Sequence, residues 1–188
     1  MPNETAPRAL VTGSSSGIGL AIAERLLAEG WRVTGFDQAP PQLEHRSFEA
    51  VRVDLSDGAA TDAAARALGK VQALVHAAGV LRVGGLGSQN SADAELMWRL
   101  HVAAVSRIAE VLVPAMAQAG TGRVVLIGSR VAQGKAGRGQ YAATKAAVIA
   151  LARSWAAEVV AQGVTVNVVS PAAKPGLESL SMTKYLFH

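Results

Sequence analysis

The stretch Arg8-Ala-Leu-Val-Thr-Gly-Ser-Ser-Ser-Gly-Ile-Gly19 decides the fold of this chain, because a short apolar run meets three glycines there. Residues 9–11 are typical of a strand that is buried on both faces of a parallel sheet. Apolar residues recur at helical spacing over residues 18–28. The stretch therefore predicts a strand, a tight turn and the start of a helix.

Each glycine has a geometric role at such a turn. Gly13 can adopt torsions closed to other residues, Gly17 lets the main chain approach a bulky ligand, and Gly19 permits close packing of helix on strand. Unpaired amides and the positive end of the helix dipole converge at the helix start, which makes a pyrophosphate a natural ligand. Glycines also end strands for purely structural reasons, so the turn alone leaves both interpretations open.

The composition is that of a single globular domain spanning residues 1–188. Half of its 188 residues are hydrophobic, which is enough for a sizeable core. There is no cysteine, which excludes disulfides, thiolate metal sites and cysteine nucleophiles and fits a reducing compartment. Residues 1–7 are polar and do not resemble a signal peptide. We therefore expect a cytoplasmic protein without a bound metal.

The net charge of +4 does not predict a nucleic-acid partner. The basic residues are scattered, and aromatic residues make up only 4% of the chain, so a stacking platform is not expected. The helix predicted over residues 141–161 is the most apolar, but Lys145, Arg153 and Glu158 interrupt it. We therefore expect no membrane-spanning helix and no membrane partner.

An acidic residue ends the second predicted strand, over residues 31–36. Asp37 follows the glycines by about 20 residues, where a carboxylate can accept both ribose hydroxyls of an adenosine and repel a 2′-phosphate. This position favours NAD, with NADP the less favoured cofactor. The alternative is that Asp37 only opens the proline-rich turn at residues 38–42.

Two further strands end in residues that suit a ligand. Residues 50–53 lead into Asp54, which is equally typical of a plain loop. Residues 71–75 lead into His76-Ala77-Ala78-Gly79, where small residues let a flat ligand lie against the backbone. His76 is a candidate acid or base, although a packed, hydrogen-bonded histidine is the commoner state.

The residues that can carry chemistry follow the fifth predicted strand, over residues 123–127. Ser129 lies at its carboxyl end, where open α/β sheets bind their ligands. Tyr141 and Lys145 are four residues apart on the next predicted helix and share one face. A nearby ammonium lowers the pKa of a phenol, which is about 10 when unperturbed, so Lys145 makes Tyr141 a usable acid or base. Ser129 would hydrogen-bond the same substrate oxygen.

The fingerprint at residues 12–19, Ser129 and the Tyr141/Lys145 pair resemble, in order and approximate spacing, the short-chain dehydrogenase/reductase family over residues 8–171. The resemblance implies a doubly wound parallel sheet of the Rossmann-like type in three α/β/α layers. It also implies an NAD-dependent oxidoreductase that interconverts a secondary alcohol and a ketone. A catalytically weak protein that binds a dinucleotide without turnover is the alternative.

The resemblance also implies which residues form the site. The implied cofactor contacts are Gly13, Ser15, Ser16, Gly17, Ile18, Gly19, Asp37, Asp54, Leu55, Ala77, Ala78, Gly79, Tyr141, Lys145 and Pro171. The implied catalytic residues are Ser129, Tyr141, Lys145 and His101. His101 stands where the family draws an Asn that holds a relay water, and a simple packing role is the alternative. His76 and Ala77 replace the usual pair of Asn residues.

The resemblance implies association as well. Family members pack as homodimers or homotetramers through helices that correspond to residues 91–116 and 140–161. After Pro171 the sequence departs from the family pattern, because residues 174–188 form an atypical tail without a strand pattern. We therefore expect the sheet to lack the usual seventh strand and the substrate side to be incompletely covered. No feature of the sequence predicts which alcohol or ketone is the substrate.

Overall fold

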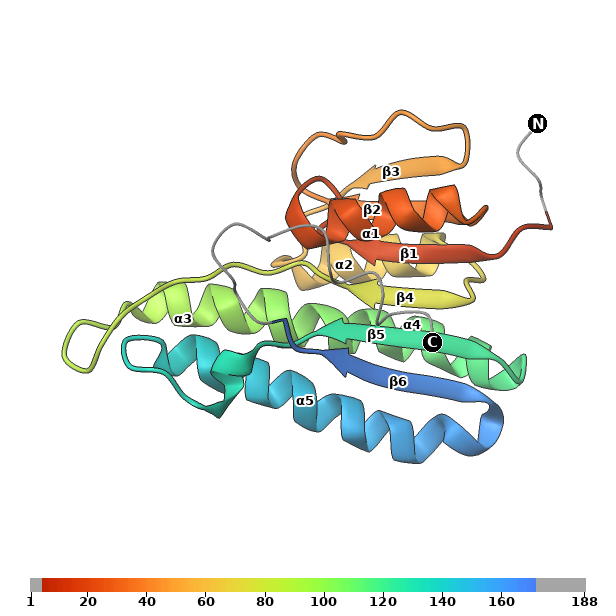
Figure 1. The fold of residues 1–188 in the computed structure, drawn as a ribbon. Coiled ribbons are helices and arrows are strands. Elements are labelled where there is room, and N and C mark those ends of the chain that lie inside the picture. Colours follow the sequence, from red (N-terminus) through yellow and green to blue (C-terminus); the bar gives the residue numbers. More distant parts are fainter. Residues whose placement is uncertain (1–4, 172–188) are drawn as a thin grey trace.

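The computed structural model describes residues 5–171, which form strands and helices packed as a sheet with helices on its faces (Figure 1). The strands are β1 (Arg8–Thr12), β2 (Arg32–Asp37), β3 (Phe48–Arg52), β4 (Ala73–His76), β5 (Gly122–Ile127) and β6 (Val164–Val169). The α-helices are α1 (Gly17–Ala28), α2 (Gly58–Ala67), α3 (Ser91–Trp98), α4 (Ala104–Gln118) and α5 (Gly139–Val159). A π-helical turn, η1 (Arg99–Ala103), joins α3 to α4, and the 3-10 turns η2 (Arg130–Gln133) and η3 (Val160–Gln162) flank α5.

The strands form one parallel sheet in the order β3-β2-β1-β4-β5-β6. The order reverses beside β1, so the carboxyl ends of β1 and β4 form the switch point of a doubly wound sheet. Val11 pairs with Val75 and Thr12 with His76 in the register of these two strands. The predicted Rossmann-like fold is confirmed.

Helices cover both faces of the sheet. On one face, Ile22 of α1 belongs to the same buried cluster as Val11. On the other face, Ile108 of α4 and Val148 of α5 share a cluster with Leu10. Alternate residues of β1 thus point into two separate cores, as the apolar run at the start of the sequence predicted.

Strand boundaries differ by one or two residues from the sequence-based ones, and sheet pairing explains two of these differences. β3 begins at Phe48 instead of residue 50, because Phe48 pairs with Val33. β4 extends to His76, because this residue pairs with Thr12 at the end of β1. Sheet pairing therefore overrides the local apolar pattern at both places.

The helix predicted over residues 91–116 is three segments that together reach Gln118. In η1 the Ala104 N–H donates to the Arg99 carbonyl, five residues back, instead of the carbonyl four residues back. A π-turn adds one residue to the helix. The apolar spacing on either side is that of an ordinary helix, which is why the pattern did not reveal the turn.

The same run, Ser91–Gln118, and not the helix predicted over residues 141–161, is the most apolar long helix of the described residues. It is the one helical run among residues 5–171 that is long and apolar enough to cross a membrane by length and composition, whereas we had taken α5 as the most apolar helix. Half of its apolar window is buried inside the domain. Val105, Ile108 and Leu112 lie in the core beneath the sheet, which is the arrangement of a core helix.

The sheet that residues 5–171 form has six strands, and β6 is its outer strand beside β5. The predicted tail over residues 174–188 lies outside the described residues. Pro171 is the last described residue and follows β6.

The turn between β1 and α1 abuts the end of β4. Gly13 has a φ of +69°, and a Cβ there would lie 2.9 Å from the Ala78 Cα and backbone nitrogen. Gly17 has a φ of +54°, but a Cβ there would meet nothing within 4 Å. Gly19 would also clash, because its Cβ would lie 2.1 Å from the Gly13 carbonyl oxygen. The glycine turn is thus a close approach of three backbone segments.

We expect Gly13→Ala to destabilise the protein more than Gly17→Ala. Both variants bear the torsional cost of a left-handed alanine, about 1–2 kcal/mol, so the difference isolates the contact with Ala78. The free energy of unfolding, from urea titration, should fall by about 2 kcal/mol more in Gly13→Ala. Equal losses in the two variants would contradict the close approach.

Candidate active site

The carboxyl ends of all six strands lie at one edge of the sheet, where the arrowheads in Figure 1 point. Thr12 is the last residue of β1 at this edge, and its Oγ1 accepts hydrogen bonds from the N–H groups of Ala77 and Ala78, both at 3.1 Å. This hydroxyl fixes the glycine turn against the small residues after β4. Gly13 therefore lies against Ala77 and Ala78 at this edge.

The amino terminus of α1 lacks a side-chain cap. Ser16 is the capping residue, but its side chain accepts no backbone N–H. By contrast, Asp57 caps α2 and Asn90 caps α3, each through two N–H groups. The open N–H groups of α1 lie beside the glycine turn and suit an anion such as a pyrophosphate.

Asp37 is half-buried and bonded to the backbone on both carboxylate oxygens. Its Oδ2 accepts the Ser15 N–H at 2.9 Å, and its Oδ1 accepts the Ala39 N–H at 2.9 Å. Asp37 thus opens the turn after β2, as one of the two sequence interpretations expected, and it also contacts the glycine turn. A carboxylate has about four acceptor positions, which leaves capacity for a ligand hydroxyl.

Asp54 has the role of a loop acid in this structure. Its Oδ1 accepts hydrogen bonds from the N–H and the hydroxyl of Ser56, both at 2.8 Å. Its neighbour Leu55 is buried. The residues implied as adenine contacts therefore lie at the expected strand end, with Asp54 exposed and bonded to its own loop.

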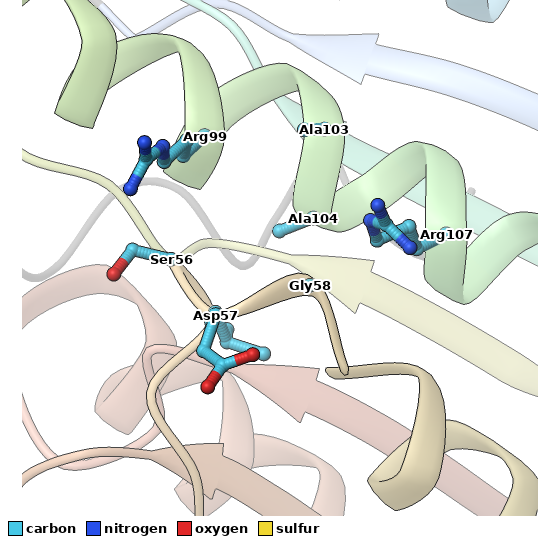
Figure 2. A pocket seen from close by; sticks show the side chains of 8 residues that line it. Ser56, Asp57, Gly58, Arg99, Ala103, Ala104 and Arg107 are labelled. Carbon is cyan, nitrogen blue, oxygen red and sulfur yellow. The ribbon is translucent and has the colours of Figure 1, made fainter. Parts of the chain in front are cut away.

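A cavity of about 450 Å³ opens beside Leu55. It is lined by Leu55, Ser56, Asp57 and Gly58 from the connection before α2, and by Arg99, Ala103, Ala104 and Arg107 from η1 and α4. Figure 2 shows Ser56 and Asp57 on one wall and the two arginines on the helix opposite. Arg107 is bonded to Asp62 at 2.7 Å, and Arg99 is paired with Glu95.

Lys145 is buried beneath Tyr141. Its Nζ donates a hydrogen bond of 2.8 Å to the Ile127 carbonyl and lies 5.8 Å from the centroid of the Tyr141 ring. Burial lowers the pKa of Lys145 to about 8, because the charged amine loses its hydration. The predicted helix spacing therefore does bring the amine and the phenol to one place.

Ser129 caps the short turn that follows β5. Its Oγ accepts the Val131 N–H at 3.1 Å, and the side chain is half-buried. The turn η2 that it begins contacts α5, the helix that carries Tyr141. Ser129 thus lies at the predicted strand end and borders the tyrosine helix.

His101 is fully buried and contacts Tyr141 edge-on, with ring centroids 5.6 Å apart. Its Nε2 accepts the Val80 N–H at 3.0 Å, so the network assigns its proton to Nδ1, which donates to Thr144 Oγ1 at 2.8 Å. Burial, reinforced by the charge of Lys145 and then by His76, lowers the pKa of His101 to about 3. Both ring nitrogens are thus bonded to protein groups.

His76 is packed and hydrogen-bonded through both ring nitrogens, which is the commoner of the two states considered from the sequence. Because Thr12 Oγ1 already accepts two N–H groups, its own proton goes to His76 Nδ1, 2.9 Å away. His76 Nε2 then donates to the Leu100 carbonyl at 3.0 Å. Burial first, and then the charge of Lys145, lower the pKa of His76 to about 3.

Sequence reasoning missed three groups that organise this site: the Thr12 hydroxyl, the Leu100 carbonyl and the Thr144 hydroxyl. Thr144 Oγ1 receives the His101 proton and donates its own to the Tyr141 carbonyl at 2.9 Å. Gly79 also has an unexpected role, since a Cβ there would lie 2.7 Å from His101 Nε2. Thr12 stands next to the glycine fingerprint, but no sequence pattern marks Thr144.

The fold and this edge define a class: a Rossmann-like α/β domain with an open helix terminus at its switch point and a Tyr–Lys pair beside it. Residues 7–175 match the short chain dehydrogenase family. The chain belongs to that family.

Curated relatives and solved structures are similar over most of the chain. The 3-oxoacyl-[acyl-carrier-protein] reductase FabG of Salmonella typhimurium is 33% identical over 189 residues, which cover 95% of this chain and 76% of that protein. The 2-dehydro-3-deoxy-L-rhamnonate dehydrogenase (NAD(+)) of Sphingomonas sp. is 31% identical over 199 residues, covering 94% and 76%. A short-chain dehydrogenase structure from Streptomyces avermitilis superposes with a TM-score of 0.87 and 35% identity over 93% of this chain and 69% of that one. These relatives place the chain among oxidoreductases.

We expect the buried Lys145 to make stability depend on pH above 8. The pKa of Lys145 is about 8 in the folded state, and the ordinary value of 10.5 applies to the unfolded chain. Between pH 8 and pH 10.5 the unfolded chain therefore binds more protons than the folded protein. Stability relative to Lys145→Met should therefore rise by up to about 3 kcal/mol from pH 8 to pH 10.5. Urea titration of both proteins across this range measures the difference.

Lys70→Met is the matched control, because Lys70 is exposed. Its stability should follow the wild type at every pH. Parallel pH profiles for wild type and Lys145→Met would contradict a buried amine.

Proposed function

We propose that this protein is an NAD-dependent oxidoreductase that interconverts a secondary alcohol and a ketone. The observation that carries the proposal is the buried Lys145 amine 5.8 Å from the ring of Tyr141, at the sheet edge where Ser129 follows β5. The names of the relatives support this reaction class, since one is a reductase of a 3-oxoacyl group and another a dehydrogenase that uses NAD(+).

The residues at the switch point fit a dinucleotide. In the proposal the uncapped start of α1 holds the pyrophosphate, and Asp37 accepts the ribose hydroxyls. The cavity beside Leu55 receives the outer edge of the adenine. Ala77, Ala78 and Gly79 lie under the rest of the cofactor, and Lys145 reaches the nicotinamide ribose. The bound nicotinamide supplies or accepts the hydride.

In the proposed reaction the chain's own residues move the proton. The Tyr141 hydroxyl donates its proton to the ketone oxygen, or takes it from the alcohol. Charged Lys145 favours the phenolate that results, and Ser129 hydrogen-bonds the same oxygen. His101 enters as a positioning residue instead of a relay-water ligand, because Val80 and Thr144 occupy its ring nitrogens.

The proposal extends to partners. A small alcohol or ketone is the substrate, in the cytoplasm, with neither nucleic acid nor membrane as partner. A homodimer or homotetramer forms through the helices at residues 91–116 and 140–161. Ala143, Ala146 and Ala150 lie exposed along α5 and permit the close approach of a second helix.

Tyr141→Phe should remove turnover and leave cofactor binding intact. The proton donor is lost while the ring remains, so kcat/KM for a ketone panel with NADH should fall by about 100-fold or more. The dissociation constant for NADH, from fluorescence titration, should stay within about twofold of wild type. Lys70→Met is the control and should keep full activity, because Lys70 is exposed and precedes β4, at the opposite edge of the sheet from Tyr141.

Unchanged turnover in Tyr141→Phe would contradict the enzyme proposal. Tight NADH binding by the wild type with no turnover on any ketone would favour the alternative, a dinucleotide-binding protein.

The Asp37 carboxylate should select against NADP. We expect the wild type to prefer NADH over NADPH by about tenfold or more in kcat/KM, because the carboxylate repels a 2′-phosphate. Asp37→Asn removes the charge and keeps one of the two oxygen acceptors that bond to the Ser15 and Ala39 N–H groups, so the preference should shrink. Equal use of both cofactors by the wild type would contradict the NAD assignment.

A further inference from the structure

Two buried histidines meet at the π-turn η1, and the proposed reaction takes no proton from either. His76 ends β4 and is 2% exposed, and His101 lies within η1 and is 0% exposed. The charged or titratable side chains that face them are Lys145 and Tyr141. The hydrogen-bond partners of the two rings show what these buried imidazoles do beside the candidate active site.

The π-turn creates the acceptor that His76 binds. The Ala104 N–H donates to the Arg99 carbonyl, so it does not bond to the Leu100 carbonyl, its partner in an ordinary α-helix. The Leu100 carbonyl turns to the sheet instead and accepts the His76 Nε2–H at 3.0 Å. A side chain of β4 thus satisfies a helix carbonyl that the π-turn released.

His76 also bonds to the floor of the cofactor region. Its Nδ1 receives the proton of Thr12 Oγ1 at 2.9 Å, and the same oxygen accepts the N–H groups of Ala77 and Ala78. One imidazole therefore connects the end of β1, the residues after β4 and the middle of the long helix.

The connection continues through the next residue of η1. His101 follows Leu100 directly and bonds to the Val80 N–H and to Thr144 Oγ1. Thr144 donates in turn to the Tyr141 carbonyl, and the His101 ring meets the Tyr141 ring edge-on. An unbroken path of hydrogen bonds and one peptide link runs from the glycine turn to the helix that carries the tyrosine.

We propose that His76 is a positioning residue for Tyr141: by holding the Leu100 carbonyl it fixes η1, and through His101 and Thr144 it orients the tyrosine toward the cofactor floor. Only its effect on turnover rests on the proposed function. The hydrogen-bonding role belongs to the chain itself.

All four hydrogen bonds of the two histidines can form together in only one arrangement of the ring protons. His76 must accept at Nδ1 and donate at Nε2, whereas His101 must donate at Nδ1 and accept at Nε2. A proton added to His76 would face the Thr12 hydroxyl, and one added to His101 would face the Val80 N–H. The two histidines are therefore neutral and opposite in tautomer.

Two substitutions separate the two bonds of His76. The Gln side chain places its amide nitrogen near the position of Nε2, so His76→Gln keeps a donor for Leu100. The shorter Asn side chain reaches only the position of Nδ1, so His76→Asn keeps the Thr12 bond and loses the Leu100 bond. The exposed His45 supplies the control, His45→Gln.

Nitrogen NMR of the ¹⁵N-histidine-labelled protein, without cofactor, tests the path apart from activity. The wild type should show His76 protonated at Nε2 and His101 at Nδ1. In His76→Asn the His101 ring proton should exchange with water at least about tenfold faster, because η1 loses the hydrogen bond from His76 to the Leu100 carbonyl and opens more often. In His76→Gln and His45→Gln its exchange should match the wild type.

Steady-state kinetics then test the orientation of Tyr141. The value of kcat should fall about tenfold or more in His76→Asn, with KM for ketone within about twofold, and should recover to within about threefold of wild type in His76→Gln. A role in stability alone predicts equal kcat per folded molecule in both variants, and that result would overturn the proposal.

A wild type with His76 protonated at Nδ1, or with His101 protonated at Nε2, would also overturn it, as would unchanged His101 exchange in His76→Asn. The wild-type spectrum decides even if His76→Asn does not fold. A wild type that shows the NMR signature but no turnover refutes the proposed function and leaves the hydrogen-bonded path supported.

Discussion

One hydroxyl group, that of Thr12, joins the parts on which the candidate site depends. It stands at the end of β1, where the strand order reverses, and accepts two amide protons from the residues after β4 while giving its own to His76. This arrangement brings Gly13 so close to Ala78 that no side chain fits between them. The glycine turn and the residues after β4 are therefore joined into one unit.

The site keeps its buried polar groups paired while limiting buried charge. Lys145 is the one buried lysine or arginine among the described residues, and the two histidines beside it stay neutral because burial and the lysine both oppose their protonation. Within residues 5–171 every buried side-chain nitrogen or oxygen has a hydrogen-bond partner. Such a network holds its members in single orientations, which suits the role proposed for Tyr141.

The sequence revealed the features that local pattern encodes. Apolar runs marked the strands, glycine spacing marked the turn, and the four-residue interval placed Lys145 beneath Tyr141. The π-turn stayed hidden, because one added residue disturbs neither flanking pattern. The partners of His101 were equally out of reach, since Val80 and Thr144 are 21 and 43 residues away in sequence. Only the folded sheet brings these groups together, so their pairing is a property of topology and not of spacing.

The π-turn also sets a rotational relation between two halves of a helix. Each residue of an α-helix turns the chain by about 100°, so the extra residue in η1 rotates α3 relative to α4 by that angle. With this offset Met97 of α3 and Val105 of α4 are both buried. Met97 and Val105 are eight residues apart, so a continuous α-helix would set them about 80° apart around its axis, whereas the extra residue brings them to within about 20°. The extra residue therefore aligns Met97 with the buried side of α4.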